Sequence, residues 1–213
     1  IFKITNEDVI LYGCSRTDAG VHAKGHVSNF HSGCKIPIEK FPLALNSNLP
    51  DDISVKKAVY VPLDFNSRFN STGKIYSYSI HNSPIRPVID RFTSHHIPQR
   101  LDINLMRQAA YRICGEHDFT CFMASKSEVK TTVRTVYGID IVAENENIKI
   151  KISGNGFLYN MVRIIAGTLC YAGLKKIEPE IIDDIIKSKD RRLAGKTLPA
   201  KGLCLEKVFY DIE

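Results

Sequence analysis

The sequence predicts an α+β fold with an antiparallel or mixed sheet. Some segments alternate apolar and polar residues, as strands do, and others repeat apolar residues every three or four positions, as helices do. The two kinds of segment do not alternate strictly along the chain, which argues against a regular βαβ architecture. With 213 residues, of which 44% are hydrophobic, the chain is long enough to bury a core.

The first third of the chain contains short strand-like segments. Residues 9–13 and 25–31 predict two strands, and the loop between them carries charged residues. Residues 37–49 predict a short helix that contains a proline, and residues 53–61 predict a further strand. A polar turn-forming segment that ends at Gly73 then marks a predicted domain boundary.

The rest of the chain carries the clearest elements. Alternation predicts a strand over residues 74–81. A helix begins after Asp102, a good N-cap residue, and ends before Gly115. The remaining predictions are a hairpin of strands 134–143 and 148–153, an apolar helix over 157–171, an amphipathic helix over 179–187 and a last strand over 205–210.

The net charge of the chain indicates the kind of partner it binds, and its hydropathy argues against a membrane protein. Lys and Arg total 29 against 23 Asp and Glu, which gives a net charge of +6 and a pI near 8.9. A basic surface favours an acidic partner such as nucleic acid, because bound Lys and Arg release the counterions of the phosphates. The sequence has no apolar run of about 18 residues and no leader pattern. We therefore expect a cytoplasmic protein without a membrane partner.

Cysteine and histidine spacing argues against disulfides and against a metal site. The six cysteines have no C-x-x-C or other short framework spacing, which is typical of reduced thiols in a cytosolic protein. Two cysteines and three histidines do crowd into residues 14–34. However, His26 and His31 would face opposite sides of a strand, and no pair has zinc-finger spacing. We expect no bound metal.

The charged loop R-T-D-A-G at residues 16–20 has two interpretations. In the first it is an ordinary β-turn, in which Asp18 bonds its own backbone and Gly20 takes a positive φ. In the second, Asp18 is a nucleophile or general base that Arg16 or another arginine keeps ionised. The loop by itself leaves both open, because the second requires partners from elsewhere in the chain.

The stretch R-T-D-A-G-V-H-A at residues 16–23, followed by Val27 and Phe30, resembles the catalytic motif of the TruA family of tRNA pseudouridine synthases. Several motifs in the family's order are far more specific than one octapeptide. The resemblance continues along the whole chain in N-S-N-L-P (46–50), D-F-N-S-R-F (64–69), K-I-Y-S-Y (74–78), G-E-H-D-F (115–119), N-M-V-R (160–163) and P-A-K-G-L (199–203).

The resemblance implies a tRNA-modifying isomerase that converts uridine to pseudouridine in the anticodon stem-loop, at positions 38, 39 and 40 of tRNA. It implies no metal and no organic cofactor. The reaction breaks the glycosidic bond between C1′ of the ribose and N1 of the uracil, and it rejoins the ribose to C5 of the same uracil. A carboxylate suits this reaction, since it can add to carbon and leave again, or abstract a proton.

By the same resemblance three residues are catalytic. Asp18 matches the essential aspartate, Tyr76 the tyrosine that stacks on the target uracil and assists proton removal from C5, and Arg163 the arginine that pairs with the aspartate. Leu203 matches an apolar residue that lines the uracil pocket. Without the resemblance, Tyr76 and Leu203 are ordinary core residues, and an arginine in an apolar helix needs some acidic partner.

Two further arginines are candidates for binding substrate. Arg16 matches an arginine that helps to displace the target nucleotide, since a stacked base must be flipped out before its C1′ and C5 are reached. Its simpler role is a turn residue bonded to Asp18. Arg68 is a candidate for a phosphate contact. The other candidates for phosphate contacts are Lys74, Arg86, Arg91, Lys126 and Arg134.

The resemblance also implies the architecture, which is a pair of similar ferredoxin-like α/β domains that form one extended sheet, with the active-site cleft between them, in a homodimer. A boundary at Gly73 gives an N-terminal domain of residues 1–72 with the aspartate, and a C-terminal domain of residues 73–213 with the tyrosine, arginine and leucine. Family members carry a strand and a helix ahead of the aspartate loop, and we expect these to be missing before Ile1.

Two other functions stay open at this point. A catalytically inactive tRNA-binding module would keep the basic surface, but it would have no need of Asp18, Tyr76 and Arg163 together. A metal-dependent hydrolase would use the histidines near Asp18, and it would require metal for turnover. The resemblance favours the synthase over both.

Overall fold

The computed structural model describes residues 1–124 and 129–211. These residues form two compact units. The first consists of Ile1–Arg16, Val27–Ser71 and the residues from Tyr210 onward, and the second consists of Thr17–His26 and Thr72–Phe209. The predicted division into residues 1–72 and 73–213 stays a prediction. The compact units differ from it because residues 17–26, which include Asp18, group with the second unit.

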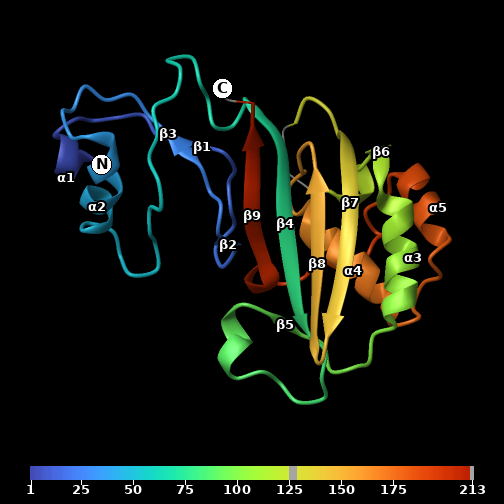
Figure 1. The fold of residues 1–213 in the computed structure, drawn as a ribbon. Coiled ribbons are helices and arrows are strands. Elements are labelled where there is room, and N and C mark those ends of the chain that lie inside the picture. The colour runs from blue at the N-terminus through green and yellow to red at the C-terminus, as the bar shows by residue number, and fades with distance from the viewer. Residues whose placement is uncertain (125–128, 212–213) are drawn as a thin grey trace. The chain divides into compact units, whose positions relative to one another are not determined.

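The second unit is built on a mixed sheet of seven strands among the described residues (Figure 1). From one edge to the other, the order is β2 (His22–Ala23), β9 (Leu203–Tyr210), β4 (Ser71–His81), β8 (Asn147–Gly154), β7 (Val133–Glu144) and β6 (Gly115–Asp118), and β5 (His95–His96) pairs with β4. The pairs β4–β8, β8–β7 and β7–β6 are antiparallel, whereas β2 runs parallel to β9 and β5 parallel to β4. The predicted α+β class with a mixed sheet is confirmed.

Three helices pack beside this sheet (Figure 1). Helix α3 (Ile103–Ile113) contacts β7 and α4 (Met161–Gly173), and α5 (Ile181–Ser188) contacts α3. The carboxylate of Asp102 caps α3 as predicted, because it accepts hydrogen bonds from the backbone N–H groups of Asn104 and Leu105 at 3.0 and 3.2 Å. The three helices that the apolar spacing predicted are therefore present in the structure.

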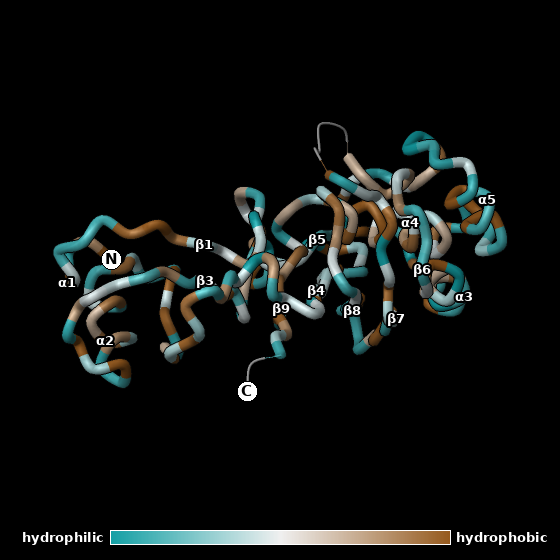
Figure 2. Tube along the Cα trace, turned by 90° about the horizontal axis from the view of Figure 1, so that it is seen from above, coloured by the Kyte–Doolittle hydropathy of each residue, from teal (hydrophilic) through white to brown (hydrophobic). Residues whose placement is uncertain are grey.

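Alternation along β8 explains which face of the sheet is covered. Ile148, Ile150 and Ile152 are buried, while the lysines between them are exposed. Ile150 and Ile152 lie opposite Tyr78 and Tyr76 of β4, so the buried residues of both strands share one face. Burial of each isoleucine side chain contributes roughly 1.5–3 kcal/mol. In Figure 2 the tube changes between hydrophilic and hydrophobic colours along β7 and β8.

Helix α4 forms the centre of the core. Eleven of its residues are buried, as the apolar run predicted. The helix begins at Met161 rather than at residue 157, because Asn160 has a left-handed backbone with φ of 60° and therefore precedes the first helical residue. No helix within residues 1–124 and 129–211 is long and apolar enough to cross a membrane. All six cysteines lie in this described part of the chain, and none of them forms a disulfide there.

The first unit has little regular structure. Strand β1 (Tyr12–Gly13) pairs antiparallel with β3 (Ser28–Asn29), and the helical segments are α1 (Phe2–Thr5), η1 (Ile38–Lys40) and α2 (Phe41–Asn46). The short proline-containing helix predicted over residues 37–49 is therefore confirmed. The side chain of Asn29 is buried and links two segments, because it donates to Phe65 O at 2.9 Å and accepts from Ser67 N–H at 2.8 Å.

The strand predicted over residues 53–61 is wrong, because that segment is irregular in the structure. The side chain of Asn46 takes the place that a neighbouring strand would fill. Its Nδ2 donates to Val55 O at 2.9 Å, and its Oδ1 accepts from Val55 N–H at 2.7 Å. One side-chain amide thus satisfies both backbone groups of a residue that would otherwise join a sheet ladder.

Candidate active site

The loop that carries Asp18 is a tight turn at the edge of the sheet. The N–H of Val21 donates to the carbonyl of Asp18 at 3.0 Å, and Gly20 has a φ of 82°, so the predicted turn is confirmed. Strand β2 follows at once and pairs with β9, and the N–H of Lys24 donates to Leu205 O at 2.8 Å. The loop is therefore held to β9 immediately after its charged residue.

Arg163 binds Asp18 across the unit. Its Nη1 lies 2.8 Å from Oδ2 of Asp18, although the two residues are 145 positions apart in the sequence. The same nitrogen donates to Oδ1 of Asn160 at 2.7 Å, and Nε donates to Leu198 O at 2.7 Å. Three fixed acceptors leave the guanidinium little freedom. The aspartate thus meets a cation whose position is already set, and such charge-assisted hydrogen bonds are stronger than neutral ones.

The ion pair is half-buried, and its two partners differ in exposure. The side chain of Arg163 is 15% exposed, and that of Asp18 is 36% exposed. The guanidinium therefore belongs to the protein interior, while the carboxylate keeps an accessible surface. A charged group that is positioned by the protein and still reachable by a ligand is suited to nucleophilic or acid–base chemistry.

Asn160 belongs to this site, and the sequence analysis assigned it no role. It stands immediately before α4 in a left-handed conformation that asparagine tolerates better than most residues. This backbone directs its side-chain oxygen at Nη1 of Arg163, which lies three residues later. A polar residue at the start of an otherwise apolar helix, in the motif N-M-V-R, is the sequence signal that could have identified it.

The segment from residue 194 to residue 202, which we call the α4 strap, supports Arg163 from the other side. Leu198 donates its N–H to the carbonyl of Arg163 at 3.3 Å and accepts from the guanidinium. The hydroxyl of Tyr78 donates to Pro199 O at 2.7 Å, and burial raises the pKa of this tyrosine, which keeps it protonated. A Cβ on Gly202 would lie 2.6 Å from the Tyr78 ring, so this position requires glycine.

Leu203 and Tyr76 lie in neighbouring strands of the sheet. Leu203 is the first residue of β9, directly after the strap, and it is 8% exposed. Tyr76 lies in β4, is also 8% exposed, and packs edge-on against Phe157 with ring centroids 5.4 Å apart. Phe157 precedes Asn160 by three residues. Tyr76 therefore contacts the segment that leads into Arg163, but its part in any reaction stays a prediction.

The two other predicted substrate residues lie in the first unit. Arg16 and Arg68 are both exposed, and the guanidinium of Arg68 lies 5.4 Å from the centroid of the Phe69 ring. Their roles stay predictions. Among the candidates for phosphate contacts, Arg91 stacks on Phe92 at 4.2 Å, and its carbonyl accepts from Nζ of Lys201 at 2.7 Å. Lys126 lies outside the described residues.

The histidines and cysteines near Asp18 do not form a metal centre. No group of three His, Cys, Asp or Glu side chains in residues 1–124 and 129–211 is arranged to hold a metal ion. His22 instead bonds through Nε2 to the carbonyl of Phe92 at 2.9 Å. The arrangement around Asp18 provides a carboxylate, a guanidinium and an amide, and it provides no ligand set.

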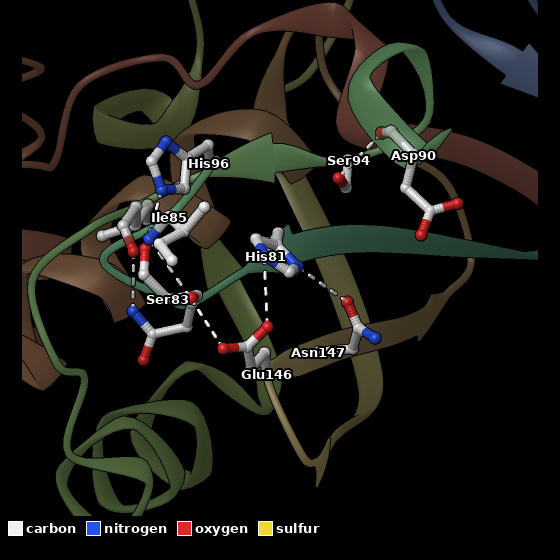
Figure 3. Close-up of polar contacts among 10 residues, drawn as sticks. His81, Ser83, Ile85, Asp90, Ser94, His96, Glu146 and Asn147 are labelled. Atoms are coloured by element: carbon white, nitrogen blue, oxygen red, sulfur yellow. Dashed lines mark hydrogen bonds and ion pairs between the residues drawn. The ribbon is translucent and has the colours of Figure 1, made fainter. Parts of the chain in front are cut away.

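A second polar cluster lies at the far end of β4 (Figure 3). The hydroxyl of Ser83 donates to Oε1 of Glu146 at 2.7 Å, and Nε2 of His81 lies 3.6 Å from Oε2 of the same glutamate. A hydrolytic triad requires the serine to bond to the histidine, and here the serine bonds to the carboxylate. The cluster therefore joins the β7–β8 turn to the residues after β4 and has a structural role.

Comparison with known proteins shows the family to which the chain is similar. A model of the family described as tRNA pseudouridine synthase matches residues 1–70 and 109–211. Proteins named tRNA pseudouridine synthase A from Clostridium acetobutylicum and Caldicellulosiruptor bescii are each 50% identical over 210 residues, which cover 99% of this chain and 86% of each relative. The protein of that name from Ruminiclostridium cellulolyticum is 48% identical over 98% of this chain and 85% of its own length.

Proposed function

The chain belongs to the tRNA pseudouridine synthase family, whose members are isomerases, and on this basis we propose that it converts uridine to pseudouridine in the anticodon stem-loop of tRNA with Asp18 as the reacting carboxylate. The sites of modification are positions 38, 39 and 40. The observation that carries the proposal is the ion pair between the accessible Asp18 and the interior Arg163.

The ion pair suits the chemistry for a physical reason. Isomerisation requires a group that attacks carbon or removes a proton and is then released, and an ionised carboxylate can do both. Arg163 holds Oδ2 of Asp18 at 2.8 Å, which fixes the direction of the carboxylate. A group that is already oriented costs less entropy when the substrate arrives. The exposed part of the carboxylate is the surface that faces the flipped nucleotide.

The other site residues complete the proposal. Tyr76 stacks on the target uracil and assists removal of the C5 proton, and Leu203 lines the apolar side of the uracil pocket. Arg16 helps to displace the nucleotide from its helix, and Arg68 contacts a phosphate. The protein acts in the cytoplasm as a homodimer and uses neither metal nor organic cofactor.

Mapping of pseudouridine on an unmodified tRNA tests the proposal. The unaltered protein is expected to form pseudouridine in the anticodon arm, and Asp18→Asn is expected to form none while still binding tRNA. Asp184→Asn is the matched control, since it makes the same change at an exposed position of α5. Binding without turnover by the unaltered protein would favour the inactive binding module instead.

A further inference from the structure

A cavity of about 530 Å³ opens beside α4 in the second unit. We call it the α4 cavity. Its floor includes Cys170 and Leu198, which are buried. Its rim carries Arg100, Lys176 and Lys196, three exposed basic residues from three different segments. The sequence predicts no role for these three residues, because they lie up to 96 positions apart and come together only in the fold.

The charge of the cavity has a single sign. No Asp or Glu is among the described residues that line it, and none of its three rim cations forms an ion pair with a described carboxylate. Like charges that are kept without a counterion inside a concave surface create a positive potential and attract anions. Nζ of Lys176 lies 5.3 Å from the centroid of the Tyr171 ring, and within residues 1–124 and 129–211 it forms no ion pair that would compete with a bound anion.

Histidines on the cavity wall are consistent with this field. Burial, followed by the charges of Lys196 and Lys201, lowers the pKa of His95 to about 4. The imidazole of His95 is therefore neutral at pH 7. His96 is oriented by the carbonyl of Ser83, which lies 2.7 Å from its Nε2 (Figure 3). The wall thus supplies oriented polar groups, and the rim supplies the charge.

The α4 strap connects this cavity to Arg163. A Cβ on Gly167 would lie 2.0 Å from the carbonyl oxygen of Lys196, so the strap lies directly on the helix backbone. The hydroxyl of Thr168 accepts from Gly195 N–H at 2.8 Å and fixes the strap in register. Gly167 follows Arg163 by four residues, which is about one helical turn, or ~6 Å along the axis. Gly167, which lines the cavity, therefore lies about one turn of α4 from Arg163.

We propose that the α4 cavity binds a backbone phosphate of the substrate RNA, at a nucleotide near the one that reacts. This inference rests on the proposed function, because it takes RNA as the substrate. Arginine and lysine heads that converge without a carboxylate suit a phosphate, which is an anion with several acceptor oxygens. Because Gly167 of the cavity lies about one turn of α4 from Arg163, the phosphate that we assign to the cavity is one of the substrate's own, next to the nucleotide at Asp18.

The salt dependence of tRNA binding tests the proposal. The double variant Arg100→Gln, Lys176→Gln removes two rim charges and leaves the strap intact. The slope of log affinity against log salt concentration is expected to become shallower by about 0.7–0.9, since the inference involves one phosphate and each lost phosphate contact contributes this much. The matched control is Lys151→Gln, Lys187→Gln, which removes two exposed charges from β8 and α5 and is expected to keep the original slope.

Other results of the salt-dependence experiment would overturn the inference. Equal slopes for the unaltered protein and the rim variant would overturn the inference, and so would equal losses in both double variants, because net charge alone would then explain the effect. If inorganic phosphate shifts the NMR signals of His95 while the rim variant keeps the original slope, the cavity takes free anions only, which also overturns it. The proposed function fails separately, when the unaltered protein forms no pseudouridine.

Discussion

Asp18 and Glu206 are two carboxylates of the second unit that each meet a cation, yet their surroundings differ. Glu206 accepts from the Ser77 hydroxyl at 2.6 Å, and it lies 3.0 Å from Nζ of Lys149 and 3.3 Å from Nζ of Lys24. Its side chain is 19% exposed, against 36% for Asp18. Glu206 is surrounded on several sides and stabilises the sheet, whereas the carboxylate of Asp18 keeps a larger exposed surface.

An ion pair with a cation is therefore not sufficient to identify a reactive carboxylate. Burial acts to raise the pKa of Glu206, but its hydrogen bonds from Ser77, Lys149 and Lys24 outweigh burial and lower the pKa to about 2. A carboxylate that is so strongly held as the anion, with its oxygens occupied, is a poor base and a poor nucleophile. Asp18 differs from Glu206 in two respects: its carboxylate is more exposed, and the position of its cation is fixed by other contacts.

Among the variants that keep Asp18, the largest effect on turnover is expected for Arg163→Lys. Lysine keeps the positive charge beside Asp18, but it cannot contact Asp18, Asn160 and Leu198 with one planar group. The carboxylate then loses its fixed direction, and turnover is expected to fall about 100-fold, as for a misplacement of about 1 Å. Single-turnover kinetics with saturating tRNA measures this, and an unchanged rate would show that charge alone is sufficient.

Asn160→Gly is expected to have the next largest effect. Glycine adopts the φ of 60° without strain, so the backbone of α4 keeps its start, but the amide that orients Arg163 is lost. Turnover is expected to fall roughly tenfold, because a hydrogen bond to a charged group is worth about 1.5 kcal/mol or more. Thermal unfolding of the same variant provides the control. A loss of stability that parallels the loss of turnover would contradict a positioning role.

Tyr78→Phe tests the contribution of the α4 strap to stability without changing the ion pair between Asp18 and Arg163. The variant removes the 2.7 Å hydrogen bond from the buried Tyr78 side chain to the carbonyl of Pro199, so the free energy of unfolding is expected to fall by about 0.5–1.5 kcal/mol. Turnover is expected to fall less than in Asn160→Gly, since the ion pair keeps its own contacts. Urea unfolding followed by circular dichroism measures the free energy of unfolding. An unchanged value would show that the bond from Tyr78 to the α4 strap does not stabilise the protein.

Glu206→Gln is expected to change stability and to leave turnover close to that of the unaltered protein. Since the pKa of Glu206 is near 2 in the folded state and ordinarily 4.5, its carboxylate stabilises the fold above pH 4.5, and this contribution is lost as the pH falls through 2. The variant is therefore expected to be less stable at pH 7 and to lose less stability on acidification. Unfolding curves between pH 7 and pH 2 show whether the two proteins converge at low pH.

The sequence predicts those parts of the fold that depend on local pattern. Alternation in β8 and the cap at Asp102 both reflect neighbouring residues, and both are confirmed. The strand predicted over residues 53–61 is wrong because the amide of Asn46 takes the backbone bonds of Val55, and no periodicity reveals such a partner. The parallel pairing of β2 with β9 joins distant segments and has no local signal.

The candidate site divides in the same way. The turn at Gly20 follows from residue type, while the contact between Asp18 and Arg163 spans 145 residues and was expected only from the family resemblance. The motif N-M-V-R marks Asn160 in the sequence, but the left-handed backbone that directs its amide at Arg163 is visible only in the structure. The rim of the α4 cavity is likewise assembled from separate segments.

The most direct test compares the two carboxylates in one experiment. Asp18→Asn and Glu206→Gln are each incubated with unmodified tRNA, pseudouridine is mapped, and the free energy of unfolding is measured on the same samples. We expect Asp18→Asn to form no pseudouridine and to keep nearly the same free energy of unfolding. We expect Glu206→Gln to form as much pseudouridine as the unaltered protein and to have a lower free energy of unfolding. Pseudouridine formed by Asp18→Asn at the rate of the unaltered protein would contradict the claim that Asp18 is the reacting group.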